Sequence, residues 1–155
     1  MDEVLKAAEQ GDPTAQTYLG ICFQTAQGVQ QDYAEAVRWF RRAADQNDAA
    51  AQCYLGFCYQ TGSGVPQEFG QAAKWFREAA EQGDPAAQFN LGVLYETGQG
   101  VPQNYALSHM WFHLAASQGD ADAAKARDMV AAKMTPDQIA EAHKLAREWK
   151  PKTGQ

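Results

Sequence analysis

The chain has 155 residues, of which 45% are hydrophobic and 21% are charged. Its 13 Lys and Arg against 19 Asp and Glu give a formal net charge of −6. This balance argues against duplex nucleic acid or an anionic membrane as the partner, because both attract clustered positive charge. The length suits one domain, and no apolar run approaches the ~18 residues of a membrane-spanning helix.

An internal repeat of 36 residues organises most of the chain. Three units, 15–50, 51–86 and 87–122, carry the same residues in the same register without an insertion. The shared positions are Ala15-Gln16, Ala51-Gln52 and Ala87-Gln88; Leu19-Gly20, Leu55-Gly56 and Leu91-Gly92; Gly28-Val29, Gly64-Val65 and Gly100-Val101; and Trp39-Phe40, Trp75-Phe76 and Trp111-Phe112. Self-similarity at this period indicates a solenoid built from one supersecondary unit.

Each repeat is predicted to fold as two antiparallel helices. In the first repeat the first helix runs from about Thr14 to Thr25, and Asp32 opens the second, because an acidic residue is favoured at a helix N-terminus. A glycine inside each first helix costs about 1 kcal/mol of helix propensity. Its recurrence at Gly20, Gly56 and Gly92 predicts that the second helix approaches closely there.

Both ends of the chain are expected to cap the array. Residues 2–11 are predicted to form an N-terminal helix, and residues 121–150 a C-terminal helix pair. In the last helix Thr135 is the N-cap and Pro136 is the first residue. The apolar stripe that should cover the last repeat consists of Ile139, Ala142, Leu145, Ala146 and Trp149.

The repeated motif Ala-Gln-x-x-Leu-Gly-x-x-Tyr-x-x-Gly-x-Gly-Val, followed by Ala-x-x-Trp-Phe-x-x-Ala-Ala, resembles the Sel-1-like repeat family, a relative of tetratricopeptide arrays. The resemblance spans about Leu5 to Asp122. It implies an all-α fold, an α/α solenoid with a right-handed superhelix, made of about three helix-turn-helix repeats in a single domain, 1–155. It also implies a non-catalytic scaffold that assembles protein complexes, without naming the partner.

By analogy with tetratricopeptide arrays, the first helix of each repeat lines a concave groove. The positions predicted to face a ligand are Thr17, Ile21 and Gln24; Cys53, Phe57 and Gln60; Phe89, Val93 and Glu96; and, in a fourth layer, Lys125 and Met129. An apolar centre with a polar edge suits an amphipathic helix or an extended peptide. The alternative is that Phe57 and Phe89 simply fill the crease between neighbouring first helices.

Two histidines of the third repeat are a weak candidate for a metal site. His109 and His113 are four residues apart, a spacing that lets two imidazoles share one metal ion, and His143 of the closing helix could approach them. The Glu that follows the first His in metalloproteases is missing. The alternative interpretation is a surface pair.

The sequence therefore favours a non-catalytic scaffold that binds a protein or peptide, with no cofactor, no catalytic residue, no nucleic acid and no membrane insertion. Two alternatives stay open: a metal-binding or enzymatic protein that uses His109 and His113, and a structural fragment of a longer solenoid. The start Met1-Asp2-Glu3 lacks the features of a signal peptide. This predicts a soluble, cytoplasmic chain, while a periplasmic or secreted location stays open in case a leader has been removed. These patterns do not fix the oligomeric state.

Overall fold

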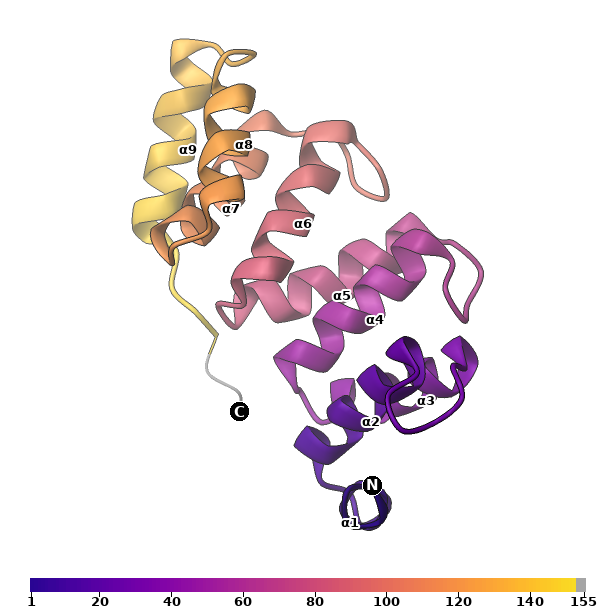
Figure 1. Cartoon of the computed structure of the whole chain (residues 1–155). Coiled ribbons are helices and arrows are strands. Elements are labelled where there is room, and N and C mark those ends of the chain that lie inside the picture. The colour runs from indigo at the N-terminus through magenta and orange to yellow at the C-terminus, as the bar shows by residue number, and fades with distance from the viewer. Residues whose placement is uncertain (153–155) are drawn as a thin grey trace. The chain divides into compact units, whose positions relative to one another are not determined.

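A computed structural model describes residues 1–152, and this part of the chain contains nine helices and no strand. They are α1 (Asp2–Glu9), α2 (Pro13–Thr25), α3 (Tyr33–Ala44), α4 (Ala49–Thr61), α5 (Phe69–Glu81), α6 (Pro85–Thr97), α7 (Tyr105–Ser117), α8 (Ala121–Ala131) and α9 (Pro136–Glu148), labelled in Figure 1. The predicted all-α fold of helix pairs is confirmed, and helix bounds agree with those predicted to within one or two residues.

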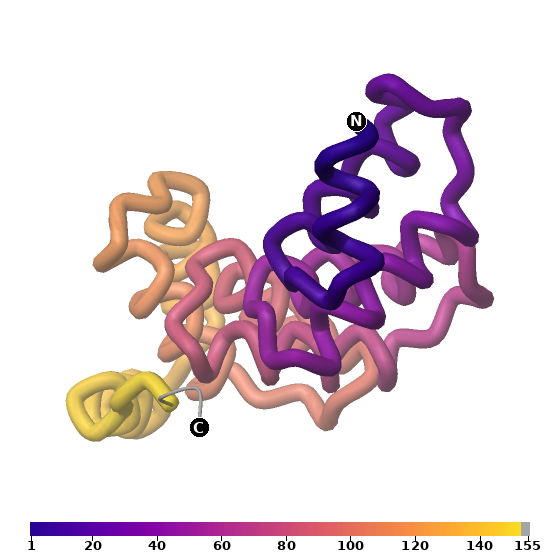
Figure 2. Tube along the Cα trace, turned by 90° about the horizontal axis from the view of Figure 1, so that it is seen from below, coloured from indigo at the N-terminus to yellow at the C-terminus, as the bar shows by residue number. Residues whose placement is uncertain are grey.

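The chain divides into two compact units, Met1–Trp75 and Phe76–Gln155. The boundary falls inside α5. Within each unit the chain runs as consecutive helices joined by short loops (Figure 2). The prediction of a single solenoid domain, 1–155, stays a prediction.

Helix starts are fixed by short polar side chains that accept hydrogen bonds from otherwise unpaired backbone amides. Asp48 and Asp84 each accept a 2.9 Å bond from the backbone N–H three residues further on. Asp32 caps α3 as predicted, with a 3.1 Å bond from the N–H of Glu35. Thr135 opens α9 with a reciprocal capping box, so the predicted N-cap is confirmed.

The loop that leaves each first helix begins in left-handed backbone. Gly62 and Gly98 have φ of 74°, and Ala26 holds the equivalent position with φ of 61°. Glycine adopts this conformation without steric cost, whereas an alanine Cβ does not. The first repeat therefore keeps the same loop geometry as the other two, with strain at Ala26.

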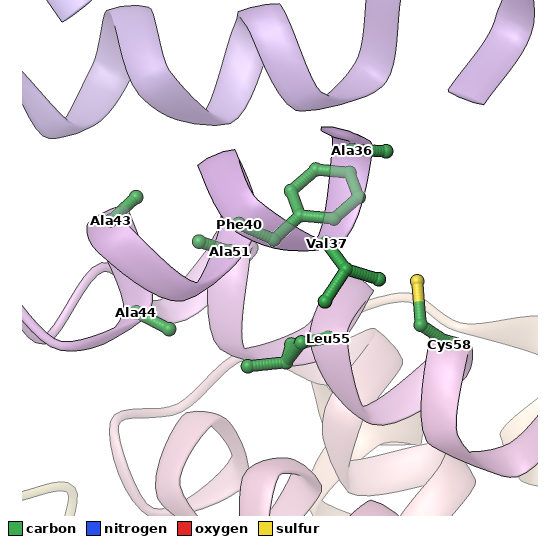
Figure 3. Close-up of a cluster of buried hydrophobic side chains, with 8 residues drawn as sticks. All are labelled: Ala36, Val37, Phe40, Ala43, Ala44, Ala51, Leu55 and Cys58. Carbon is green, nitrogen blue, oxygen red and sulfur yellow. The ribbon is translucent and has the colours of Figure 1, made fainter. Parts of the chain in front are cut away.

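One core cluster of the first unit lies between α3 and α4 (Figure 3). Val37 and Phe40 of α3 lie over Leu55 and Cys58 of α4, and each of these side chains is at most 6% exposed. The small residues Ala36, Ala43, Ala44 and Ala51 complete the cluster. The double alanine that closes the repeat thus lets α3 and α4 pack closely.

The predicted close approach at the helical glycines is confirmed at two of them. A Cβ added at Gly20 would lie 2.5 Å from the ring of Phe40, and one added at Gly92 would lie 2.7 Å from the ring of Phe112. Both rings are fully buried. The space is therefore filled by the Phe of each Trp-Phe pair, which lies directly over the glycine of the preceding helix.

A buried glutamine joins each first helix to the helix before it. The side-chain amide of Gln16 donates to the carbonyl of Ala8 at 3.0 Å, and Gln88 donates to the carbonyl of Ala80 at 3.2 Å. Both glutamines are at most 1% exposed. Because a buried amide needs a partner, this bond explains the Gln of the repeated Ala-Gln pair.

Helices α8 and α9 both pack against α7, so the closing helix pair covers the last repeat as predicted. Within α9, Ala142 is the buried residue, and the rest of the predicted stripe is half-buried: Ile139, Leu145, Ala146 and, at the helix end, Trp149. The rings of Trp149 and of Trp111 on α7 pack edge to face, with centroids 6.1 Å apart.

Candidate functional site

One position of the 36-residue register is apolar on every first helix. It is occupied by Ile21 on α2, Phe57 on α4, Val93 on α6 and Met129 on α8. Phe57 is 45% exposed and Met129 is 69% exposed, the largest exposed fraction among the large hydrophobic side chains. Ile21 and Val93 are half-buried. Since a stable core does not need large apolar side chains in solvent, this exposed apolar register is the candidate binding feature of both units.

In the first unit, the remaining predicted groove residues differ in accessibility. Thr17 is only 7% exposed, and its hydroxyl donates to the carboxylate of Asp48 at 3.3 Å, which leaves little of it to contact a ligand. Gln24, Cys53 and Gln60 are half-buried. The accessible part of this face is therefore centred on Phe57.

In the second unit, Phe89 is half-buried and packs on the buried Phe112, with ring centroids 5.5 Å apart. Phe112 is on α7, the second helix of the same repeat, so this contact does not place Phe89 in a crease between neighbouring first helices. The environment of Phe89 differs from that of Phe57. Glu96 forms an ion pair with Lys133 at 3.4 Å. Lys125 on α8 is exposed.

A hydrogen bond that joins the loop after each first helix back to that helix was not anticipated from the sequence. The side-chain amides of Gln31, Gln67 and Gln103 donate to the backbone carbonyls of Gln24, Gln60 and Glu96, at 2.8, 2.9 and 2.8 Å. The signal was available, because the three glutamines are 36 residues apart. These bonds hold the polar edge of the predicted groove in one conformation.

The basic residues of the second helices pair with aromatic rings. The Arg42 guanidinium lies 4.7 Å from the centroid of the Trp39 ring, and the Lys74 ammonium lies 5.3 Å from that of Trp75. Arg41 donates to the hydroxyl of Tyr59, and Arg77 repeats the contact with Tyr95. The contacts of Arg41 and Arg77 link consecutive helices, whereas those of Arg42 and Lys74 lie within one helix. On α3, Arg38 forms a 2.7 Å ion pair with Glu35.

The histidines lie where α7 meets α8 and α9. His109 is 5% exposed, so its interpretation as part of a surface pair is wrong; the reason is that α9 covers this face of α7. His143 of α9 does approach it, with ring centroids 5.6 Å apart. Among residues 1–152, no group of three or more His, Cys, Asp or Glu is arranged to hold a metal ion.

The thiols of Cys22 and Cys58 are buried in the core. Burial raises the pKa of Cys58 to about 11, so its sulfur stays protonated and unreactive at neutral pH. In the described part of the chain, no helix has both the length and the apolar character needed to cross a bilayer.

The same structural features recur from repeat to repeat. They are the 36-residue register, the glycine under a buried Phe ring, and the left-handed residue that ends the first helix. A family model for the Sel1 repeat matches residues 13–48, 49–84 and 85–120. The chain belongs to the Sel1 repeat family. Members of this family are commonly scaffolds for protein–protein interaction and are generally non-catalytic.

Solved structures of Sel1 repeat proteins share the fold. A Sel1 repeat protein from Oxalobacter formigenes is 36% identical with a TM-score of 0.75, over 81% of this chain and 95% of that one. The protein c5321, a protective antigen of uropathogenic Escherichia coli, is 30% identical with a TM-score of 0.74, over 94% of this chain and 39% of that one. Cysteine-rich protein B of Helicobacter pylori is similar in fold, with 21% identity and a TM-score of 0.64, over 79% and 93%. Comparison with curated proteins gives no match.

Proposed function

We propose that this Sel1 repeat protein is a non-catalytic scaffold that binds a protein or peptide through the exposed apolar register of its first helices. The observation that carries the proposal is the exposure of Phe57 and Met129, two large apolar side chains 72 residues apart at the same register position. A solenoid dictates its core positions by stacking. Ile21 packs against the core cluster of the first unit, whereas stacking does not account for the exposed side chains of Phe57 and Met129.

A ligand of either unit presents apolar anchors to the register positions of that unit, which are Ile21 and Phe57 in the first unit and Val93 and Met129 in the second. Phe57 offers a rigid aromatic face, and Met129 offers a flexible side chain that adapts to irregular surfaces. Glu96 with Lys133, and Lys125 on α8, supply charged groups beside the apolar positions of the second unit. An amphipathic helix or an extended segment with alternating apolar side chains meets these requirements.

The test compares capture of partners by the wild-type protein with capture by Phe57→Ser and Met129→Ser, in extracts of the cells that naturally produce the protein. Anchors of this kind commonly contribute about 2 kcal/mol each to affinity, which is a loss of about 30-fold in affinity for each variant. The matched control is Tyr33→Ser, because Tyr33 is 41% exposed and lies outside the register.

A protein retained by wild type and by the Tyr33 variant, and lost with either register variant, supports the proposal. Equal retention by all four proteins contradicts it, as does an equal loss with the Tyr33 variant. Circular dichroism of each variant confirms that the compared proteins are folded.

A further inference from the structure

We propose that α9 is an acid-sensitive cap, which stays on α7 while His109 and His113 are uncharged and is released when these two histidines are protonated. His109 and His113 of α7 form a cluster with His143 of α9. Release of α9 would uncover an apolar face of α7. This inference concerns regulation of the fold and is independent of the proposed ligand-binding register.

The face that α9 covers differs from the equivalent face of the first repeat. Met110 and Leu114 of α7 are 5% and 9% exposed. The residues 72 positions earlier on α3 are Arg38 and Arg42, which are both exposed. The outer face of the last repeat is therefore built to be covered, and its cover is α9.

The centre of the cluster is a buried imidazole with an unsatisfied nitrogen. Nδ1 of His109 is inaccessible to solvent and has no hydrogen-bond partner. The ring faces that of His143 on α9, with centroids 5.6 Å apart and planes tilted by 58°. Protonation of both ring nitrogens would place a positive charge in this buried position and leave the Nδ1–H without an acceptor, which is costly.

The second histidine also requires the neutral state. Nδ1 of His113 lies 3.4 Å from Nη1 of Arg127 on α8. A guanidinium can only donate hydrogen bonds, so this Nδ1 must be the acceptor and carry no proton. Protonation of His113 would turn the contact into a repulsion between two cations.

Among the other charged groups around the cluster, Asp128 favours protonation of His109, but its effect on that pKa is smaller than those of burial, the two other histidines and Arg127. From α8, Asp128 is 75% exposed at its side chain and already bonds Arg127 at 3.2 Å. From α9, Arg147 lines the same open cleft as His113 and His143, a cleft of about 360 Å³ between α7 and α9. Acidification therefore adds positive charge to a cluster that two arginines already flank.

The direction of the pH effect follows from the pKa values. Burial, reinforced by His143, His113 and Arg127, lowers the pKa of His109 from 6.5 to about 4. Burial, with Arg127 and His143, also lowers the pKa of His113. A histidine with a lowered pKa binds fewer protons when α9 is docked, so the docked state keeps its full stability above about pH 6.5 and loses it as pH falls toward about 4.

As the pH falls, α9 should open before the other helices of the second unit. Within it, Ala142 is the buried residue, and its other apolar side chains are only half-buried. Elements with little buried apolar surface open at lower cost than the core helices. The fully buried Phe112 and Leu91 keep α6 and α7 together while α9 opens.

The test is amide hydrogen exchange of the full chain at pH 7.5 and pH 5.0, corrected for the intrinsic pH dependence of exchange, with EDTA in both buffers. A pKa displaced from 6.5 to about 4 predicts that protection of the α9 amides falls by about 30-fold at pH 5.0. The amides of α6 should keep their protection and serve as the internal control.

The matched variant is His109→Val, because valine occupies the equivalent buried position at Val37 of the first repeat. It should keep α9 protected at both pH values. Equal protection of α9 in the wild type at the two pH values overturns the proposal, and so does an undiminished loss in the variant. If the variant does not fold, an NMR titration of wild-type His109 decides: a pKa well below 6.5 supports the proposal, and an ordinary pKa overturns it.

Discussion

Phe57 and Phe89 were predicted as a pair, and their surroundings separate them. Phe57 stands 45% exposed on α4, whereas Phe89 is half-buried against the ring of Phe112. The two residues occupy neighbouring positions of the repeat register, with Phe89 one turn before Val93. A helical periodicity places both on one face but does not give the tilt of the neighbouring helix, which decides how much of each ring is covered.

The difference predicts that the same substitution destabilises the protein by different amounts at the two positions. Phe57→Ser should lower the free energy of unfolding by less than about 1 kcal/mol, because most surface substitutions have small effects. Phe89→Ser should lower it by about 2–3 kcal/mol, because it removes a packed ring. Urea unfolding of the two variants measures both values, and equal losses would show that the two rings share one environment.

A larger side chain at Gly92, the glycine beneath Phe112, should overpack the core. Gly92→Val should destabilise the fold by about 1–3 kcal/mol, because its Cβ would press on a fully buried ring that has no room to move. Gly70 of α5 is the control, since an added Cβ there meets nothing within 4 Å. Gly70→Ala should raise stability by about 0.5–1 kcal/mol through lower entropy of the unfolded chain. An unfolding midpoint for Gly92→Val at or above that of the wild type would refute this account.

At the scale of the helix, the left-handed residues that end α2 and α4 predict opposite changes in stability for two substitutions. Ala26→Gly should stabilise the protein by about 0.5–1 kcal/mol, because glycine relieves the φ of 61° that ends α2. Gly62→Ala places the same strain at the end of α4 and should destabilise by a similar amount. Thermal unfolding of the two variants checks the signs. Shifts in the same direction would contradict the equivalence of the two loops.

The helices and their order could be predicted from the sequence because the same residue pattern occurs in every repeat. The cap at Asp32, the left-handed glycines and the closing helix at Pro136 follow from local chemistry that tertiary contacts do not override. The burial of His109 was missed, since it depends on α9 folding over α7. A signal was present in the switch from Arg38 and Arg42 to Met110 and Leu114, which marks the last outer face as covered.

At the scale of the whole molecule, the chain combines a repeated core with a face that varies between repeats. The core positions, such as the Trp-Phe pair and the buried glutamine, are nearly invariant across the three repeats. The exposed apolar register carries Ile, Phe, Val and Met at equivalent positions. Under the proposed function, stability would depend mainly on the repeated core residues, and ligand choice on the exposed members of the register, Phe57 and Met129.

The central claim is that a protein ligand contacts this register, and site-specific photocrosslinking tests it most directly. A photoreactive phenylalanine analogue would be placed at position 57, at position 129 or at the exposed off-register position 33, in cells that naturally produce the protein. The account predicts that positions 57 and 129 yield adducts with a partner protein, and that position 33 does not. Adducts from position 33 alone, or the same adducts from all three positions, would contradict it.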